Sequence, residues 1–315
     1  MSTELIFDCD TGIDDTMAIV YGAGNGAEYV ACTVTHGNVP VHVGTRNTIT
    51  VLDRLGLTDV PVHQGAARPM AQPLMTAEFV HGEDGLGDAG VPASSREPAG
   101  TLAAAEIVRL ARSRPGELTL VAVGPLTNIG LALLLEPELP RLVKNVVVMG
   151  GAVGVPGNAS ETGEANIWHD PEAAQLVLDA PWDLVLVGLE ITMVATQLSQ
   201  EALKRIETST DPRAQFMWPV MQHYLDVYEK NLGERTCVLH DPLAMALALD
   251  PDLATYRLVR AAVELRGERS RGQVVADLRG YEPAPEDPRE PGVVRIVDTL
   301  DTAAFHERFL SALGA

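Results

Sequence analysis

Four aspartates near the amino terminus are spaced as in a metal site. They fall within eight residues, at Asp8, Asp10, Asp14 and Asp15. Because crowded carboxylates repel one another and lose hydration, a positive charge is needed to hold them at neutral pH. A hard divalent cation, which prefers oxygen ligands, meets that need.

These acids lie at the junction between an expected strand and an expected helix. Residues 5–7 predict a short buried strand, and the apolar run 17–20 predicts the start of a helix after a turn at Gly12. The acids thus follow the carboxyl end of a strand, where open α/β sheets bind ligands. We expect Asp10 to reach the ion and Asp8 to support it from behind. Asp14 or Asp15 alone is equally well explained as a helix cap.

Composition limits the classes of partner. The 315 residues are 46% hydrophobic, and 43 acidic against 23 basic side chains leave a formal charge of −20. Such an acidic chain is poorly suited to binding nucleic-acid phosphates. No apolar run reaches the length of a membrane span, and the chain start shows no signal-peptide pattern. The three cysteines predict buried, reduced thiols. We expect a cytoplasmic protein that binds neither nucleic acid nor membrane.

Strands and helices alternate along most of the chain. Apolar patterns predict further strands over 29–35, 60–63, 118–123, 143–149, 182–188, 259–265 and 293–297. Helices are expected over 45–55, 102–113, 211–231 and 243–249, after the turn 124–128 and from 170 onward. This rhythm favours parallel strands with right-handed crossovers. A Pro-rich stretch covers 282–291, and no break in composition divides residues 1–315, so we expect a single α/β domain.

Two long loops carry polar residues. Loop 66–100 contains His81 and is long enough to predict a mobile lid, whereas loop 150–166 contains Asn158, Glu164 and Asn166. Loops that follow parallel strands converge on one edge of the sheet. A hard metal among carboxylates and amides suits a neutral polyhydroxylated ligand, such as a sugar diol, better than a phosphate.

The chain resembles the inosine-uridine preferring nucleoside hydrolases. The matching segments occur in the family's order and span most of the chain: 8–15, 36–38, 124–128, 148–151, 157–158, 164–167, 170–174 and 240–242. The resemblance implies one large, open, mostly parallel mixed sheet flanked by helices. It also implies hydrolysis of the N-glycosidic bond of ribonucleosides by a homodimer or homotetramer.

The resemblance also assigns roles to residues. Ca²⁺ is expected on Asp10, Asp15, Asp241 and the backbone carbonyl of Thr127. The ribose is expected to contact Asp14, Asn38, Met149, Asn158, Glu164 and Asn166. Asp10 matches the general base that takes a proton from a metal-bound water, and His240 matches an acid that assists the leaving base. His81 and Tyr228 match positions around the nucleobase.

The sequence departs from the family pattern at two positions. Thr11 stands where Pro is usual, but it matches no ligand. Ala165 replaces a bulky aromatic residue, which enlarges the pocket beside the sugar. His36 has no family role and is expected to be structural.

Three alternatives remain. A strand that ends in Asp-x-Asp is also typical of haloacid-dehalogenase-like phosphatases, although Gly12 stands where they carry Thr or Val. The chain could instead be a nucleoside or ribose binding protein that has lost turnover. His240 could be a helix cap or a core histidine.

Overall fold

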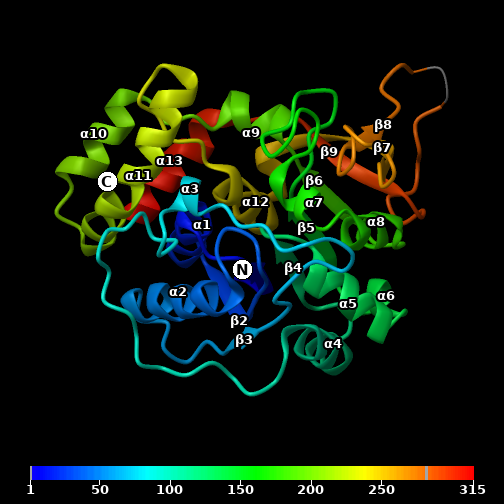
Figure 1. The fold of residues 1–315 in the computed structure, drawn as a ribbon, viewed down its shortest axis with the longest axis horizontal. Coiled ribbons are helices and arrows are strands. Elements are labelled where there is room, and N and C mark those ends of the chain that lie inside the picture. Colours follow the sequence, from blue (N-terminus) through cyan, green and yellow to red (C-terminus); the bar gives the residue numbers. More distant parts are fainter. Residues whose placement is uncertain (1, 281–282) are drawn as a thin grey trace.

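The computed structural model describes residues 2–280 and 283–315, in which nine strands form one sheet (Figure 1). The strand order is β3-β2-β1-β4-β5-β6-β9-β7-β8. Strands β1 to β6 and β9 pair in parallel, whereas β7 pairs antiparallel with both β9 and β8. The strands are β1 (Thr3–Cys9), β2 (Ala27–Val34), β3 (Val62–Gln64), β4 (Thr119–Ala122), β5 (Asn145–Met149), β6 (Leu184–Val187), β7 (Ala254–Val263), β8 (Val274–Ala276) and β9 (Val293–Leu300).

Helices cover both faces of the sheet (Figure 1). They are α1 (Ile13–Gly24), α2 (Val41–Arg54), α3 (Glu78–His81), α4 (Ala103–Ser113), α5 (Thr127–Leu135), α6 (Leu139–Leu142), α7 (Ala165–His169), α8 (Pro171–Asp179), α9 (Leu189–Ala195), α10 (Gln200–Thr208), α11 (Pro212–Leu232), α12 (His240–Leu249) and α13 (Thr302–Leu313). Among the described residues, none of these helices is long and apolar enough to cross a membrane.

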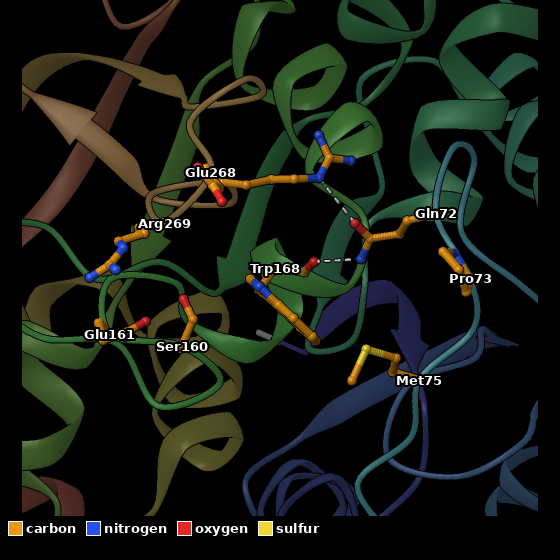
Figure 2. A pocket seen from close by; sticks show the side chains of 9 residues that line it. Gln72, Pro73, Met75, Ser160, Glu161, Trp168, Glu268 and Arg269 are labelled. Carbon is orange, nitrogen blue, oxygen red and sulfur yellow. Dashed lines mark hydrogen bonds between the residues drawn. The ribbon is translucent and has the colours of Figure 1, made fainter.

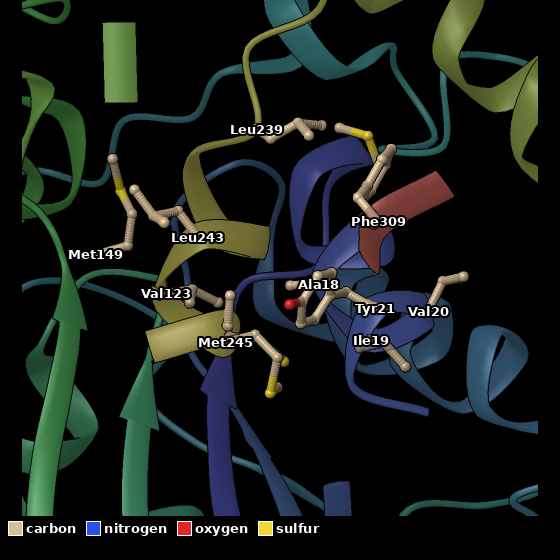
Figure 3. Close-up of a cluster of buried hydrophobic side chains, with 14 of the residues drawn as sticks. Ala18, Ile19, Val20, Tyr21, Val123, Met149, Leu239, Leu243, Met245 and Phe309 are labelled. Atoms are coloured by element: carbon tan, nitrogen blue, oxygen red, sulfur yellow. The ribbon is translucent and has the colours of Figure 1, made fainter. Parts of the chain in front are cut away.

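Two cores lie on opposite faces of the sheet. Leu5 and Phe7 of β1 belong to one core and Ile6 belongs to the other, as the alternation of side chains along a strand requires. Because β1 is buried on both faces from Leu5 onward, its residues 5–7 form a continuous apolar run. Figure 3 shows side chains of α1, α12 and α13 gathered in the first core. Helix α1 is buried on nearly all sides, so the acids at its start are held in a rigid setting.

The predicted alternation is confirmed, and the differences lie at element ends and in short elements. Helix α2 begins at Val41, before the predicted start at 45, and α3, α9, α10 and β8 were not predicted. Asn166, placed in a loop by the sequence, lies in the first turn of α7. Position 282, where the predicted Pro-rich stretch begins, lies outside the described residues.

The sheet order brings the polar loops together. Strands β2, β1, β4 and β5 are consecutive neighbours and all run parallel, so their carboxyl ends lie side by side. The segments that follow them carry Asp10, Asn38, Thr127 and Glu164, which are among the predicted site residues. Open α/β sheets bind their ligands at this edge, so we expect the active site there.

Candidate active site

A cavity of about 320 Å³ lies at this edge of the sheet. Its wall contains these predicted site residues: Asp14, Asn38, His81, Met149, Asn158, Glu164, Asn166, Tyr228, His240 and Asp241. Asp10, Asp15 and Thr127, the other predicted metal ligands, are buried and do not line the cavity wall. A neighbouring cavity of about 420 Å³ is larger but contains none of the clustered aspartates, so the first cavity is the candidate active site.

Three carboxylates meet at one side of this cavity. Oxygens of Asp14, Asp15 and Asp241 all lie within 4.8 Å of one another. The set predicted from the sequence contains Asp10 in place of Asp14. Asp10 lies close by, since its backbone amide donates to Asp15 Oδ1 at 3.0 Å.

The backbone around Asp10 and Asp15 leaves little freedom to either carboxylate. Asp15 Oδ2 accepts hydrogen bonds from the amide of Gly12 at 2.8 Å and from Asn38 Nδ2 at 2.9 Å. Asp15 therefore supports the start of α1 as well as facing the cluster, which agrees with the capping alternative. The amide of Asn38 donates to Asp10 Oδ2 at 2.7 Å. A Cβ atom at Gly37 would lie 1.9 Å from that same oxygen, so only glycine fits there.

The buried carboxylates of the cluster need a cation to balance their negative charge. Burial, reinforced by neighbouring carboxylates, raises the pKa of Asp10 and of Asp241 well above the usual range. Burial also raises the pKa of Asp14 and of Asp15 to about 6. Asp10 Oδ1 and Asp241 Oδ2 are buried and accept no hydrogen bond. No lysine or arginine of the described residues lines the cavity. Unpaired carboxylate oxygens without a cationic side chain are the donor set that Ca²⁺ prefers, so the residues fit this metal.

Thr127 is held at the start of α5 by two buried side chains. Its hydroxyl donates to Asp170 Oδ2 at 2.7 Å and lies 3.0 Å from His36 Nε2. Asp170 Oδ2 also accepts the amide of Met70 at 3.0 Å, which ties loop 66–100 to the same point. These contacts fix Thr127 in position, while its role as a carbonyl ligand stays a prediction.

Asp8 lies behind the cavity and is not part of its wall. Its Oδ2 accepts hydrogen bonds from the Thr33 hydroxyl at 2.6 Å and from Asn128 Nδ2 at 2.9 Å. Burial raises the pKa of Asp8 to about 7. Asn128 also accepts the amide of Ala66 at 2.8 Å, so Asp8 is linked through Asn128 to the start of loop 66–100. Its predicted supporting role is compatible with this position.

A second side of the cavity is built from the segment around α7. The Glu164 carboxylate caps α7 by accepting the amides of Asn166 and Ile167, and it also accepts the amide of Gly151 at 2.9 Å. Burial raises the pKa of Glu164 to about 7. Asn166 Nδ2 donates to the carbonyls of Val123 and Met149. These bonds orient an amide and a carboxylate toward the cavity, as a hydroxyl-rich ligand requires.

The third side carries a hydrogen-bonded chain of aromatic and histidine side chains. The Tyr224 hydroxyl donates to Asp14 Oδ2 at 3.2 Å and lies 3.4 Å from the Tyr228 hydroxyl. Tyr228 in turn lies 2.7 Å from His240 Nε2, and His240 Nδ1 lies 2.8 Å from the Thr192 hydroxyl. This chain connects the carboxylate cluster to the opposite side of the cavity.

Both histidines on this side are uncharged at neutral pH. Burial lowers the pKa of His240 to about 3 and that of His81 to about 4. His81 stacks on Tyr224 with ring centroids 5.7 Å apart. Flat apolar faces of this kind suit a nucleobase.

The structure corrects the cap interpretation of one histidine and adds two residues to the candidate active site. Helix α12 begins at His240 with Leu239 as its cap, so the cap interpretation of His240 is wrong. Sequence analysis assigned no site role to Thr192 or to Tyr224. The spacing of four residues between Tyr224 and Tyr228 places both on one helix face, and it was the only available signal.

Comparison with known proteins agrees with this geometry. The family model for inosine-uridine preferring nucleoside hydrolase matches residues 5–307. A protein of that name from Crithidia fasciculata is 39% identical over 287 residues, which cover 90% of each chain. Another from Leishmania major is 37% identical, with 94% of each chain covered.

Solved structures of nucleoside hydrolases also resemble this chain. A plant nucleoside hydrolase, the PpNRh1 enzyme, superposes with a TM-score of 0.93 at 30% identity and covers 100% of both chains. A purine-preferring ribonucleoside hydrolase from Gardnerella vaginalis superposes with a TM-score of 0.91 at 31% identity, covering 99% of this chain and 98% of its own.

The chain therefore belongs to the inosine-uridine preferring nucleoside hydrolase family. It is an enzyme that hydrolyses the N-glycosidic bond of ribonucleosides. The phosphatase alternative is accordingly not supported.

Proposed function

We propose that this enzyme uses Ca²⁺, held by Asp10, Asp15, Asp241 and the carbonyl of Thr127, to hydrolyse ribonucleosides to base and ribose. The observation that carries the proposal is the buried carboxylate cluster, which has two unpaired oxygens and, among residues 2–280 and 283–315, no lysine or arginine in the cavity wall. Bound Ca²⁺ supplies positive charge that neutralises the cluster and lowers the pKa of water beside it.

The residues of the cavity then divide the remaining work. Asp10 Oδ1, which accepts no hydrogen bond within the protein, is free to take the proton of the attacking water. Asp14 and Glu164 line the cavity and stabilise the positive charge that develops on the ribose as the bond breaks. Asn38, Met149, Asn158 and Asn166 complete the wall around the sugar.

His240 assists the departing base at the other end of the cavity. Since burial keeps this imidazole neutral in the free enzyme, Nε2 accepts from Tyr228 or donates to it. Negative charge that builds on the leaving base favours the protonated imidazole, so His240 takes up a proton from solvent as the bond weakens and passes it to the base. Tyr228 and His81 lie beside the base.

Replacing His240 with alanine is expected to affect poor leaving groups most. Loss of a general acid lowers kcat by about 10²–10⁴-fold when the base needs a proton. p-Nitrophenyl riboside has a leaving group that needs no proton, so its hydrolysis should change by only about threefold, far below the range for a general acid. Steady-state kinetics on both substrates measures the difference, and equal losses would contradict the role of His240.

The proposed reaction is tested by release of reducing sugar from inosine, adenosine, uridine and cytidine, with and without Ca²⁺ and in the absence of phosphate. Ribose from any of them establishes hydrolysis and ranks the bases. The names of related proteins include both purine-preferring and uridine enzymes, so the ranking is informative. Binding without ribose release from all four would point to a different ribosyl substrate.

We also propose that the enzyme acts in the cytoplasm as a homodimer or homotetramer. Its three cysteines, Cys9, Cys32 and Cys237, are free and buried, as is usual in a reducing compartment. Leu134 and Leu135 of α5 are 62% and 60% exposed, which provides apolar surface for a second copy. Light scattering coupled to size-exclusion chromatography measures the number of subunits.

A further inference from the structure

A second cavity of about 420 Å³ adjoins the active-site cavity. Figure 2 shows the side chains that line it. It lies between loop 66–100, loop 150–166 and the turn before β8, and its wall includes Gln72, Ser160, Glu161 and Arg269. Met75 and Trp168 line both this cavity and the active-site cavity. The two spaces are therefore neighbours that share a wall.

Trp168 forms a fixed part of that shared wall. Its carbonyl accepts a hydrogen bond from Gln72 Nε2 at 2.8 Å, drawn as a dashed line in Figure 2. A Cβ atom at Gly163 would lie 2.9 Å from Trp168 Cδ1, and one at Gly272 would lie 2.9 Å from Trp168 Cα. Because both glycines allow this close packing, the indole is held in one place.

The position of a bound ribose follows from the three sides of the active-site cavity. If the sugar diol faces the carboxylates and the base faces His240 and Tyr228, the substituent on C4′ must face the remaining side. That side carries Ala159 and Ala165, whose side chains are single methyl groups. A group attached to the 5′ carbon is therefore not blocked there and is directed toward Trp168 and Met75.

We propose that the second cavity is a subsite for a neutral, apolar substituent on the 5′ carbon of the ribose, so that the enzyme hydrolyses 5′-alkylthio and 5′-arylthio nucleosides. This inference rests on the proposed function. A thioether or aromatic group would contact the indole of Trp168 and the thioether of Met75, both of which favour such partners.

The charges around the subsite disfavour a phosphate. Arg271 is already paired, because its Nη2 donates to both carboxylate oxygens of Glu172, at 2.8 and 2.7 Å. The remaining charged side chains of the wall are Arg269 and two acids, Glu161 and Glu268. With no net positive charge, the subsite offers no advantage to a 5′-monophosphate.

The test compares kcat/KM for three substrates with the same base: the parent nucleoside, its 5′-deoxy-5′-benzylthio analogue and its 5′-monophosphate. We expect the benzylthio analogue to stay within about tenfold of the parent, as contacts in an apolar pocket offset the lost hydroxyl, and the monophosphate to be the poorest. Hydrolysis of the parent but not of the analogue would overturn the subsite alone. Preference for the monophosphate over the analogue would overturn its neutral character. Failure to hydrolyse the parent would instead remove the proposed function, and the subsite with it.

Two variants that add bulk test the location. Glu161→Trp fills the second cavity from an exposed position whose side chain makes no hydrogen bond or ion pair in the structure, and Glu161→Gln removes the charge without adding bulk. Glu161→Trp should lower kcat/KM for the benzylthio analogue by at least about tenfold relative to the parent, whereas Glu161→Gln should leave the ratio unchanged. Ala165→Phe, which fills the space that the single methyl group leaves beside the sugar, should reduce the same ratio. An unchanged ratio in both bulky variants would refute the proposal.

Discussion

Replacing Asp10 with asparagine is expected to lower kcat by about 10²–10⁴-fold, the usual contribution of a general base. The structure shows why this variant should remove the proton acceptor and leave substrate binding intact. The amide of Asn38 donates to Asp10 Oδ2, so the carboxamide oxygen must occupy that position. The new NH₂ group then falls where Oδ1 stands, and it can no longer accept a proton. Because the shape of the side chain is retained, affinity for the nucleoside should change little.

Asp8→Asn is the matched control for Asp10→Asn. It makes the same chemical change two residues away, at a carboxyl that is bonded to Thr33 and Asn128 behind the site and already tends to hold a proton because burial raises its pKa to about 7. We expect a loss of less than about tenfold in kcat, below the range for a general base. Single-turnover kinetics and calorimetric titration separate chemistry from binding. Equal losses in the two variants would contradict the assignment of Asp10 as the base.

Removal of Ca²⁺ is the second change with a large expected effect. After exhaustive dialysis against a chelator, activity should fall to background, because the clustered carboxylates then repel one another and no longer hold the sugar diol. Addition of Ca²⁺ should restore it. Full activity after the chelator treatment, with metal content verified by elemental analysis, would exclude the metal role.

The same treatment should make stability depend on pH. The pKa of Asp14 and of Asp15 is about 6 in the folded protein, against 3.8 for an aspartate side chain that is free in water. The folded state therefore binds protons more tightly, and the metal-free protein loses stability as the pH rises from about 4 to about 6. Bound Ca²⁺ favours the ionised carboxylates and should remove this loss.

Thermal unfolding between pH 4 and pH 8, with and without Ca²⁺, measures this effect. Surface ion pairs have the opposite effect on stability, because they stabilise the folded protein more as the pH rises. Arg213, for example, holds the pKa of Asp211 at about 2. Since those pairs are the same in both samples, the difference in Tm between them isolates the cluster. A difference in Tm that does not grow between pH 4 and pH 7 would show that these carboxylates are not the metal site.

Much of the site could be predicted from the sequence because its signals are local. Apolar runs and turn residues predicted the strands that end at Cys9, Val34, Ala122 and Met149, and parallel pairing placed the following loops at one edge. Asp14, Asn38, Glu164, Asn166 and Asp241 do line one cavity there. Short elements such as α3 and β8 escaped prediction because three or four residues carry too little periodicity.

Only the tertiary structure decided the contacts between residues that lie far apart in the chain. Tyr224 has the same apolar spacing as its packing neighbours on α11, and only the approach of α11 to α1 brings its hydroxyl to Asp14. Likewise, Thr192 meets His240 because α9 and α12 pack together. The shared wall at Trp168 also depends on two loops and a turn that meet in space. Side-chain direction at such places is set by packing against distant elements, which no local pattern in the sequence records.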